Sequence, residues 1–382
     1  MMTATKLKLN VKFSAQVDFS SYRTLASEAI ADISARAGKK GQFLNWIGEL
    51  QNIQIKNLDS LYELCQNAKK GGYEELAILG IGGSRHTTES MVKTLGVDKN
   101  VHFYSSVDPE SFKRFANGLN LDKTKFLVVS KSGGTLETTT AYNNAKELMQ
   151  KYTGKEDVSE KFIGMTDASS EKSALRRLVD AGELSGSGFV HDDVGGRFSI
   201  LDDATLFTLF WVGYSKEDVL NLLNSSLEAQ KVYMTQDVDS NPAMQLAIFN
   251  VESKLNGNNK HFVEYFGDAF MGTTLWEKQL KNESLKARIS TDTNVGPGYL
   301  HYNAEADLDT ANKDSFFTFV YAKTEDKTTN AVLSGVISAY SNMHPVSIIE
   351  MDNLDLRTVA QFIELKHFET LYTGNILRRK EN

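Results

Sequence analysis

Short apolar segments alternate with helical segments from residue 75 onward, and this alternation limits the possible folds more than any other feature. Strands are predicted at residues 76–79, 101–104, 126–129 and 162–165, and again at 261–266, 316–321 and 346–350. Strands that alternate with helices build βαβ units with a parallel sheet, and right-handed crossovers place helices on both faces. The sequence therefore predicts an α/β fold of two doubly wound parallel sheets, each inside an αβα sandwich.

The chain of 382 residues has room for two or three domains. Residues 1–70 have mainly helical patterns, and the segment 200–255 is helical apart from a break near Pro242, so no flexible linker separates the two α/β halves. We expect an N-terminal helical extension at residues 1–55, a first α/β domain at 56–215 and a second at 216–382.

Composition excludes several classes of function. The net charge is −7 and no long basic run occurs, which argues against nucleic-acid binding. No apolar stretch approaches the roughly 20 residues that span a bilayer, and the first 13 residues lack the apolar core of a signal peptide. Cys65 is the only cysteine, which fits a reducing, cytoplasmic compartment. No cysteine, histidine or carboxylate pattern predicts a metal site.

The segment 126–140 is a buried strand that runs into a helix through Ser130, Lys131, Ser132, two glycines and Thr135. Free N–H groups and the dipole at a helix N-terminus favour an anion, and the hydroxyl groups and the lysine add further donors. An ordinary strand-to-helix turn capped by serine or threonine is the alternative. This stretch alone does not separate the two interpretations.

A second glycine loop, Gly80-Ile81-Gly82-Gly83-Ser84, follows the first strand and opens a helix. It is not a dinucleotide fingerprint, because Arg85 takes the third glycine position and the next strand ends in Ser105-Ser106 without an acidic residue. In a doubly wound sheet both loops lie at the carboxyl edge, where ligands bind. Two loops of small residues suit a monophosphate better than a nucleotide.

A helix predicted near residues 274–283 carries the candidate base. On a 3.6-residue repeat, Trp276, Gln279, Leu280 and Glu283 share an arc of about 100°, which leaves Glu277 and Lys281 outside it. A carboxylate on an apolar face is a candidate base of raised basicity. Alternatively, Glu283 ends the helix and reaches solvent.

Two further side chains are candidates because of the turns around them. Arg197 follows Gly195-Gly196, where small residues let a ligand approach the backbone, and His301 follows the turn-rich segment 296–300. Taken alone, an arginine in a turn is more often solvated and a single histidine more often structural.

Five motifs in chain order resemble those of the phosphoglucose isomerase family. They are Gly80-Ile81-Gly82-Gly83-Ser84; Ser130-Lys131-Ser132-Gly133 with Thr135 and Glu137; Gly195-Gly196-Arg197-Phe198-Ser199; Gln279 with Glu283-Ser284; and Gly296-Pro297-Gly298-Tyr299-Leu300-His301. The last is most similar to the isomerase part of fused transaldolase–isomerase proteins.

The resemblance implies two sugar-isomerase (SIS) domains, a homodimer, and interconversion of glucose 6-phosphate and fructose 6-phosphate in glycolysis and gluconeogenesis, without a metal or other cofactor. It implies catalytic roles for Glu283, Arg197 and His301, the histidine reaching the site from the neighbouring subunit. Substrate-binding roles are implied for Gly82, Ser84, Ser130, Lys131, Ser132, Thr135, Glu137, Gly196 and Gln279.

The sequence departs from the family pattern in three places. Leu285-Lys286-Ala287 follows Glu283-Ser284 where the family has Asn/Glu-Gly-Lys, and the glutamine expected after the histidine is Glu305. The family's C-terminal Asn-Pro-Phe segment and lysine-bearing helix have no counterpart, and the chain ends in a charged tail that contains Arg378-Arg379-Lys380. Ring opening is therefore predicted to be weakened. Two alternatives stay open: a non-catalytic sugar-phosphate-binding SIS protein, and an isomerase of altered sugar specificity.

Overall fold

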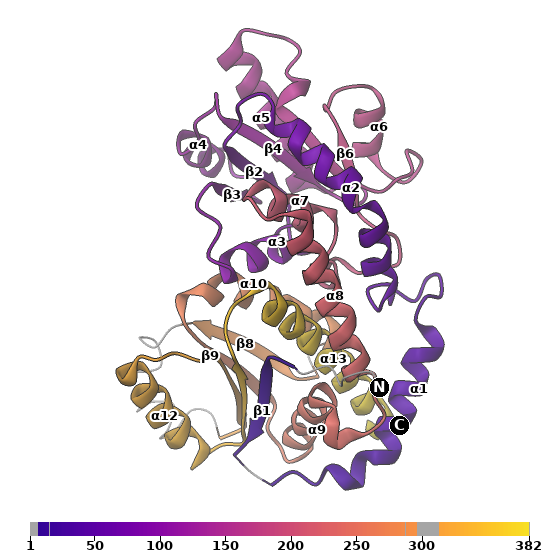
Figure 1. Cartoon of the computed structure of the whole chain (residues 1–382), viewed down its shortest axis with the longest axis vertical. Helices are drawn as coiled ribbons and strands as arrows, with labels where there is room; N and C mark the ends of the chain where they lie inside the picture. The colour runs from indigo at the N-terminus through magenta and orange to yellow at the C-terminus, as the bar shows by residue number, and fades with distance from the viewer. Residues whose placement is uncertain (1–6, 15, 287, 296–312, 382) are drawn as a thin grey trace. The chain divides into compact units, whose positions relative to one another are not determined.

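The computed structural model describes residues 7–14, 16–286, 288–295 and 313–381. The chain forms two compact units, one of residues 38–223 and one of residues 1–37 together with 224–382, and each contains a five-stranded sheet (Figure 1). The predicted α/β fold with two parallel sheets is confirmed. The expected boundaries at residues 55/56 and 215/216 differ from this division, because the N-terminal residues join the second sheet rather than form a separate extension.

The sheet of the 38–223 unit is parallel throughout and has the order β3-β2-β4-β5-β6. Its strands are β2 (Glu75–Leu79), β3 (Val101–Tyr104), β4 (Thr124–Val129), β5 (Phe162–Thr166) and β6 (Ser187–Phe189). All six residues of β4 are buried, as expected for a central strand with helices on both faces. The three-residue β6 was not predicted, since it is too short to give an apolar pattern.

Six helices surround this sheet: α2 (Glu49–Lys69), α3 (Gly83–Thr94), α4 (Pro109–Asn117), α5 (Leu136–Thr153), α6 (Ala174–Asp180) and α7 (Asp203–Trp211). On one face, side chains of α4, α5 and α6 pack on Phe126 and Phe162, whose rings stack 5.2 Å apart. Helices α3 and α7 contact each other, and Thr88 and Thr205 join them by a hydroxyl hydrogen bond of 3.0 Å. The core therefore fixes the strand ends from which the two predicted phosphate loops leave.

Strand order creates a crevice between β2 and β4. The chain passes from β2 to β3 on one side and then returns to place β4 on the other. Connections diverge at such a switch point, so the carboxyl ends of the two strands are open to a ligand. Both predicted phosphate loops begin there.

The second sheet has the order β1-β10-β9-β7-β8. Its strands are β1 (Leu9–Phe13), β7 (Lys260–Phe266), β8 (Ser290–Val295), β9 (Ser315–Ala322) and β10 (Val346–Met351). Four strands are parallel, whereas β1 pairs with β10 in the antiparallel direction and closes one edge. Neither β1 nor β8 was predicted; β8 is mostly polar, and the partner of β1 lies more than 300 residues away.

The helices of this unit are α1 (Arg23–Arg36), α9 (Pro242–Leu255), α10 (Met271–Leu285), α12 (Lys327–Ser341) and α13 (Leu356–Glu381), and α8 (Lys216–Tyr233) continues into it. α13 is buried along most of its length and packs on α9, α10 and α1 (Figure 1). It runs to Glu381, so Arg378, Arg379 and Lys380 are part of the helix.

The charged tail is the last turn of α13 and packs on α1. Arg379 forms an ion pair of 3.1 Å with Glu28, and the Lys380 ammonium lies 4.7 Å from the centre of the Tyr22 ring. The helix therefore keeps partners through its last turn.

Two helix starts illustrate how the sequence sets these elements. Asp108 and Asn241 each cap a helix by accepting a backbone N–H, and Pro109 and Pro242 occupy the first helical positions. Proline is favoured there because the position needs no N–H donor.

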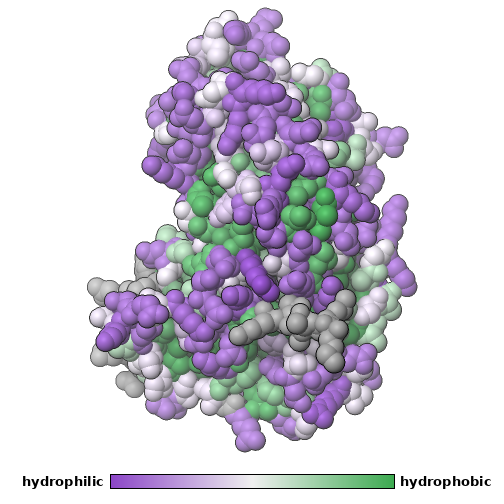
Figure 2. Space-filling view, in the orientation of Figure 1, coloured by the Kyte–Doolittle hydropathy of each residue, from purple (hydrophilic) through white to green (hydrophobic). Residues whose placement is uncertain are grey.

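No helix among the described residues is long and apolar enough to cross a membrane. On the face seen in Figure 2, hydrophilic residues predominate at the top of the view, where residues of the 38–223 unit lie.

Candidate active site

A pocket of about 380 Å³ opens at the carboxyl ends of β2 and β4. Ser84 from the first loop and Ser130, Lys131, Ser132 and Thr135 from the second all line it. The structure therefore brings together, within one unit, four hydroxyl groups and one ammonium group that the sequence assigned to phosphate binding. Glycine and serine loops at two helix N-termini supply the backbone donors that an anion requires.

The second loop is shaped by its own hydrogen bonds. Ser130 Oγ accepts the Gly133 N–H at 3.0 Å, and Ser132 Oγ accepts the Gly134 N–H at 3.3 Å. Gly133 has φ +64°, and a Cβ there would lie 2.0 Å from the Leu175 nitrogen, so only glycine fits. Thr135 is the N-cap of α5, yet its side chain makes no capping hydrogen bond, so simple capping does not account for this hydroxyl group.

The first loop touches the segment that carries Arg197. Gly82 precedes α3 with φ +56°, and a Cβ added at Gly83 would lie 2.4 Å from the carbonyl carbon of Gly196. Gly196 begins a short 3-10 helix, Gly196–Phe198, in which the half-buried Arg197 guanidinium lies 5.4 Å from the Phe198 ring centre. The absence of side chains on both glycines thus lets the Ser84 loop and the Arg197 turn meet backbone to backbone.

Charged residues missed by the sequence reasoning also line the pocket: Asp167, Lys172 and Asp192. Lys172 pairs with Asp192 at 2.6 Å, and this hydrogen bond lowers the pKa of the Asp192 carboxyl. Lys131 donates to the His191 carbonyl at 3.1 Å and lies 3.5 Å from Asp192. Asp167 and Asp192 follow β5 and β6, so their position after strands of one parallel sheet is the signal that could have found them.

Glu137 is half-buried in the first turn of α5 and is not among the pocket-lining side chains. Its carboxylate contributes negative charge near the helix N-terminus, which suits the helix dipole. The substrate-binding role implied for Glu137 stays a prediction.

In the other unit, α10 carries Gln279 and Glu283 on one side. Gln279 Nε2 donates to Glu283 Oε1 at 3.0 Å, and the Glu283 side chain is exposed while Gln279 is half-buried. The prediction that Glu283 shares the buried face with Trp276 and Leu280 is wrong. The two apolar residues are buried, but the face they belong to continues toward Glu277 and Lys281 instead.

The burial of Glu277 and Lys281 was not predicted. Both side chains are at most 1% exposed, and both are paired with charged residues of α13. Their spacing of four residues beside Trp276 and Leu280 is compatible with a shared buried face, and that spacing is the signal that could have indicated it.

The implied histidine, His301, lies outside the described residues. The C-terminal helix α13 carries two lysines: Lys380 lies against the Tyr22 ring, and Lys366 is completely buried. Because its ammonium group contacts Glu277 and Glu369 in the interior, it does not stand in for a substrate-contacting lysine.

One cluster in the 38–223 unit has the residue types of a metal site. Ligand atoms of His191, Asp202 and Asp203 lie within 4.8 Å of one another. His191 Nδ1 is 2.5 Å from Asp202 Oδ1, while Asp203 accepts hydrogen bonds from the Phe189 N–H and from Gln54. These groups are therefore partners in a hydrogen-bond network that fixes the loop before Arg197.

Burial and neighbouring charge shift the pKa values of this cluster. Burial, reinforced by the Asp202 charge, raises the pKa of Asp203 to about 6. Burial alone would lower the pKa of His191, but its hydrogen bond to Asp202 raises it above the usual value. The cluster thus holds a proton more strongly than its isolated groups would.

Comparison with known proteins decides the family. Residues 55–325 match the family model described as phosphoglucose isomerase. The chain belongs to the phosphoglucose isomerase family. A glucose-6-phosphate isomerase from Clostridium novyi is 25% identical over 89% of this chain and 82% of its own length. One from Methanocaldococcus jannaschii is 26% identical over 74% of this chain and 69% of its own length.

Two solved structures share the fold of this chain. A glucose-6-phosphate isomerase from Chlamydia trachomatis superposes with a TM-score of 0.83 at 15% identity, covering 97% of this chain and 85% of that one. A hypothetical protein from Thermus thermophilus gives a TM-score of 0.82 at 19% identity, covering 94% and 91%. The likeness thus extends over nearly the whole chain.

Proposed function

We propose that this phosphoglucose isomerase family member interconverts glucose 6-phosphate and fructose 6-phosphate through a cis-enediol intermediate, a step of glycolysis and gluconeogenesis. The family assignment makes it an aldose–ketose isomerase. The observation that carries the proposal for this chain is the single pocket in which Ser84, Ser130, Ser132, Thr135 and Lys131 meet at the ends of β2 and β4.

The phosphate group is the anchor of the proposed substrate. It carries about −1.5 to −2 charges near neutral pH, which suits four hydroxyl donors, a lysine and the N-termini of α3 and α5. Gly82 and Gly196 leave room for the ligand to approach the backbone. Binding energy from this remote group holds the reacting carbons in place for proton transfer.

Glu283 is the proposed base that removes the C2 proton and returns it to C1. Its exposure makes it accessible, and the hydrogen bond from Gln279 orients its carboxylate. Such a base contributes a factor of ~10²–10⁴ in rate. Negative charge develops on oxygen in the enediol, and the Arg197 guanidinium is the proposed cation that stabilises it.

Ring opening is assigned to His301, as the family resemblance implies. Two further expectations are part of the proposal. The resemblance implies a homodimer in which the partner subunit supplies this histidine, and the single cysteine fits a cytoplasmic location.

The test is a coupled assay of the purified protein with fructose 6-phosphate, with Glu283→Gln as the variant. The substitution removes the proton acceptor and keeps the volume, so kcat should fall by ~10²-fold or more while sugar-phosphate binding persists. Near-normal turnover in the variant would point to another base. An inactive wild-type protein that still binds sugar phosphate would instead favour a non-catalytic sensor, and a higher rate with mannose 6-phosphate would indicate altered specificity.

A further inference from the structure

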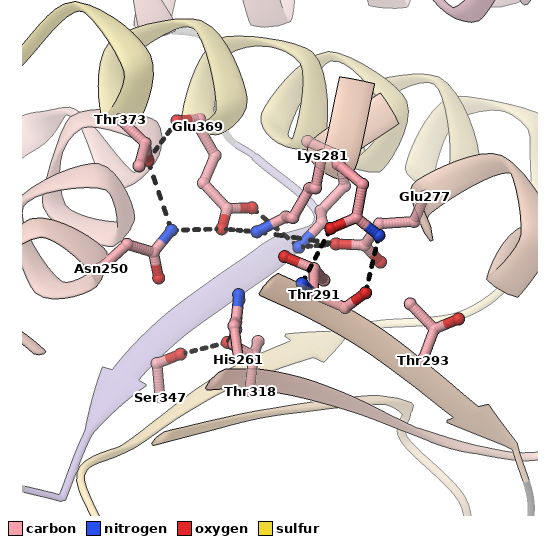
Figure 3. Close-up of polar contacts among 12 residues, drawn as sticks. Asn250, His261, Glu277, Lys281, Thr291, Thr293, Thr318, Ser347, Glu369 and Thr373 are labelled. Atoms are coloured by element: carbon pink, nitrogen blue, oxygen red, sulfur yellow. Dashed lines mark hydrogen bonds and ion pairs between the residues drawn. The ribbon is translucent and has the colours of Figure 1, made fainter. Parts of the chain in front are cut away.

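A closed ring of four charged side chains lies in the interior of the unit formed by residues 1–37 and 224–382 (Figure 3). Lys366 Nζ lies 2.6 Å from Glu277 Oε1 and 2.7 Å from Glu369 Oε2. Lys281 bonds Glu369 and lies 3.8 Å from Glu277, which closes the ring with alternating charges. None of the four side chains is more than 1% exposed. The ring is electrically neutral and sealed from solvent.

Polar groups from neighbouring elements complete the ring. The Tyr265 hydroxyl of β7 donates to Glu277, and Asn250 Nδ2 of α9 donates to Glu369 Oε1 at 2.8 Å. Glu277 and Lys281 belong to α10, and Lys366 and Glu369 belong to α13. The ring therefore joins four elements, α9, α10, α13 and β7, through polar contacts whose distances depend on how these elements are placed.

His261 borders the ring without joining it (Figure 3). Its Nε2 shares a hydrogen bond of 2.7 Å with the Thr318 hydroxyl, and Thr318 in turn bonds Ser347 at 2.8 Å. Burial, together with the Lys281 charge, lowers its pKa well below the usual range, so it adds no charge. The neutrality of the ring thus depends on its own two lysines and two glutamates.

Stability alone does not account for such a ring. Removing four charges from water is costly, and buried ion pairs are commonly no more stabilising than apolar side chains of the same volume. What the ring adds is directionality, because apolar contacts tolerate rotation and sliding of a helix, whereas a closed set of ion pairs, three of them at hydrogen-bonding distance, restricts both motions.

The ring contacts the buried side of α10, and the proposed base, Glu283, lies on the exposed side of the same helix. Glu277 and Lys281 lie about 160° around the α10 axis from Gln279 and Glu283, at 100° per residue. Asn282 further fixes α10 by accepting the Thr291 N–H of β8 at 2.9 Å and donating to the Thr291 carbonyl at 2.8 Å. Rotation or sliding of α10 would displace Glu283, and a shift of about 1 Å at a reacting group can cost ~10²-fold in rate.

We propose that Glu277, Lys281, Lys366 and Glu369 are positioning residues that hold α10, and with it Glu283, in the geometry for proton transfer at the substrate. This inference rests on the proposed role of Glu283 as base. The four residues belong to the same unit as Glu283, whereas the phosphate pocket is built from residues of the 38–223 unit. The ring should therefore influence the proton-transfer step and leave phosphate anchoring unchanged.

The decisive variant is the double substitution Lys281→Met with Glu369→Gln, which removes one positive and one negative charge and leaves the Lys366–Glu277 pair neutral. Lys281→Met alone leaves an excess negative charge in the interior and should lower the thermal midpoint clearly, and the double variant should recover most of that loss. In the double variant we expect kcat for fructose 6-phosphate to be about tenfold lower or more, with the inhibition constant of inorganic phosphate unchanged.

Tyr265→Phe is the second variant, because it removes one hydroxyl group that bonds Glu277 and changes little volume. It should fold even if the double variant does not, with kcat about three- to tenfold lower. The matched control is Lys278→Met on the same helix, whose exposed lysine pairs with Asp292 at 2.8 Å, and its kcat should equal that of the wild type.

A normal kcat in folded Tyr265→Phe, or in the folded double variant, would overturn the proposal and leave the ring with a purely structural role. A parallel fall of kcat and of phosphate affinity would also overturn it, because it would indicate general loosening. The Glu283→Gln variant separates the two hypotheses. If it is active, the assignment of the base fails; if it is inactive while the ring variants turn over normally, only the positioning inference fails.

Discussion

Substituting Gly83 by alanine should test whether the backbone contact between the Ser84 loop and the Arg197 turn sets the geometry of the site. The added Cβ would lie 2.4 Å from the carbonyl carbon, 2.5 Å from the oxygen and 2.8 Å from the Cα of Gly196. Ordinary contact begins at 3.4 Å, so the two backbones must separate by about 1 Å. All three atoms are backbone, and no side-chain rotation relieves the clash.

The Gly83→Ala substitution should lower the activity more than it lowers the free energy of unfolding. Overpacking of this kind costs about 1–3 kcal/mol, but alanine gains up to about 1 kcal/mol over glycine inside a helix, and Gly83 is the first residue of α3. The net loss of stability is then about 2 kcal/mol or less. A shift of about 1 Å between the phosphate loop and Arg197 should lower kcat/KM by ~10²-fold.

The assay measures kcat/KM with fructose 6-phosphate alongside the thermal midpoint. Gly335→Ala is the matched control, because it lies in α12 with no atom within 4 Å of the added Cβ. It should be as active as the wild type and equally or more stable. A Gly83→Ala protein with normal kcat/KM would refute the argument that backbone contact between the two loops sets the site geometry.

Three further predictions follow from the structure. Lys131→Met should raise KM for sugar phosphate by ~10-fold or more with little change in kcat. The reason is that the substrate complex and the transition-state complex lose the same charged hydrogen bond to the phosphate. An unchanged KM would show that Lys131 is not part of the anion site. The pKa of Asp203 in the folded protein is about 6, above the ordinary 3.8, so protonation of this carboxyl stabilises the fold at low pH, and this contribution is lost as the pH rises from 4 through 6. Relative to wild type, the unfolding free energy of Asp203→Asn should therefore rise by up to about 3 kcal/mol between pH 4 and pH 8. A pH-independent difference between the two proteins in urea titrations would contradict the shift. A chain ending at Leu377 loses the Arg379–Glu28 ion pair and the Lys380–Tyr22 contact. Its free energy of unfolding should fall by about 1–2 kcal/mol with kcat unchanged. A fall in kcat without a fall in the thermal midpoint would give the tail a catalytic role.

Local sequence determined the strands and loops that build the phosphate pocket. The apolar run of β4 is buried on both faces, and the glycines beside Ser84 and Ser132 occupy positions where a Cβ would clash or φ is positive. Such signals are readable because burial of a whole strand and left-handed backbone each restrict the residue type at the position itself.

Tertiary structure alone decided which face of α10 is buried. The 3.6-residue repeat placed Trp276 and Leu280 inside, but it fits a buried arc extending toward Glu283 as well as one extending toward Glu277. The choice depends on Lys366 and Glu369, which lie some 90 residues further along the chain and neutralise Glu277 and Lys281 in the interior. Strand β1 shows the same dependence, since its partner β10 lies at the other end of the chain. A sequence reports the preference of each segment, whereas the burial of a charge or the pairing of an edge strand depends on a partner that only folding brings into contact.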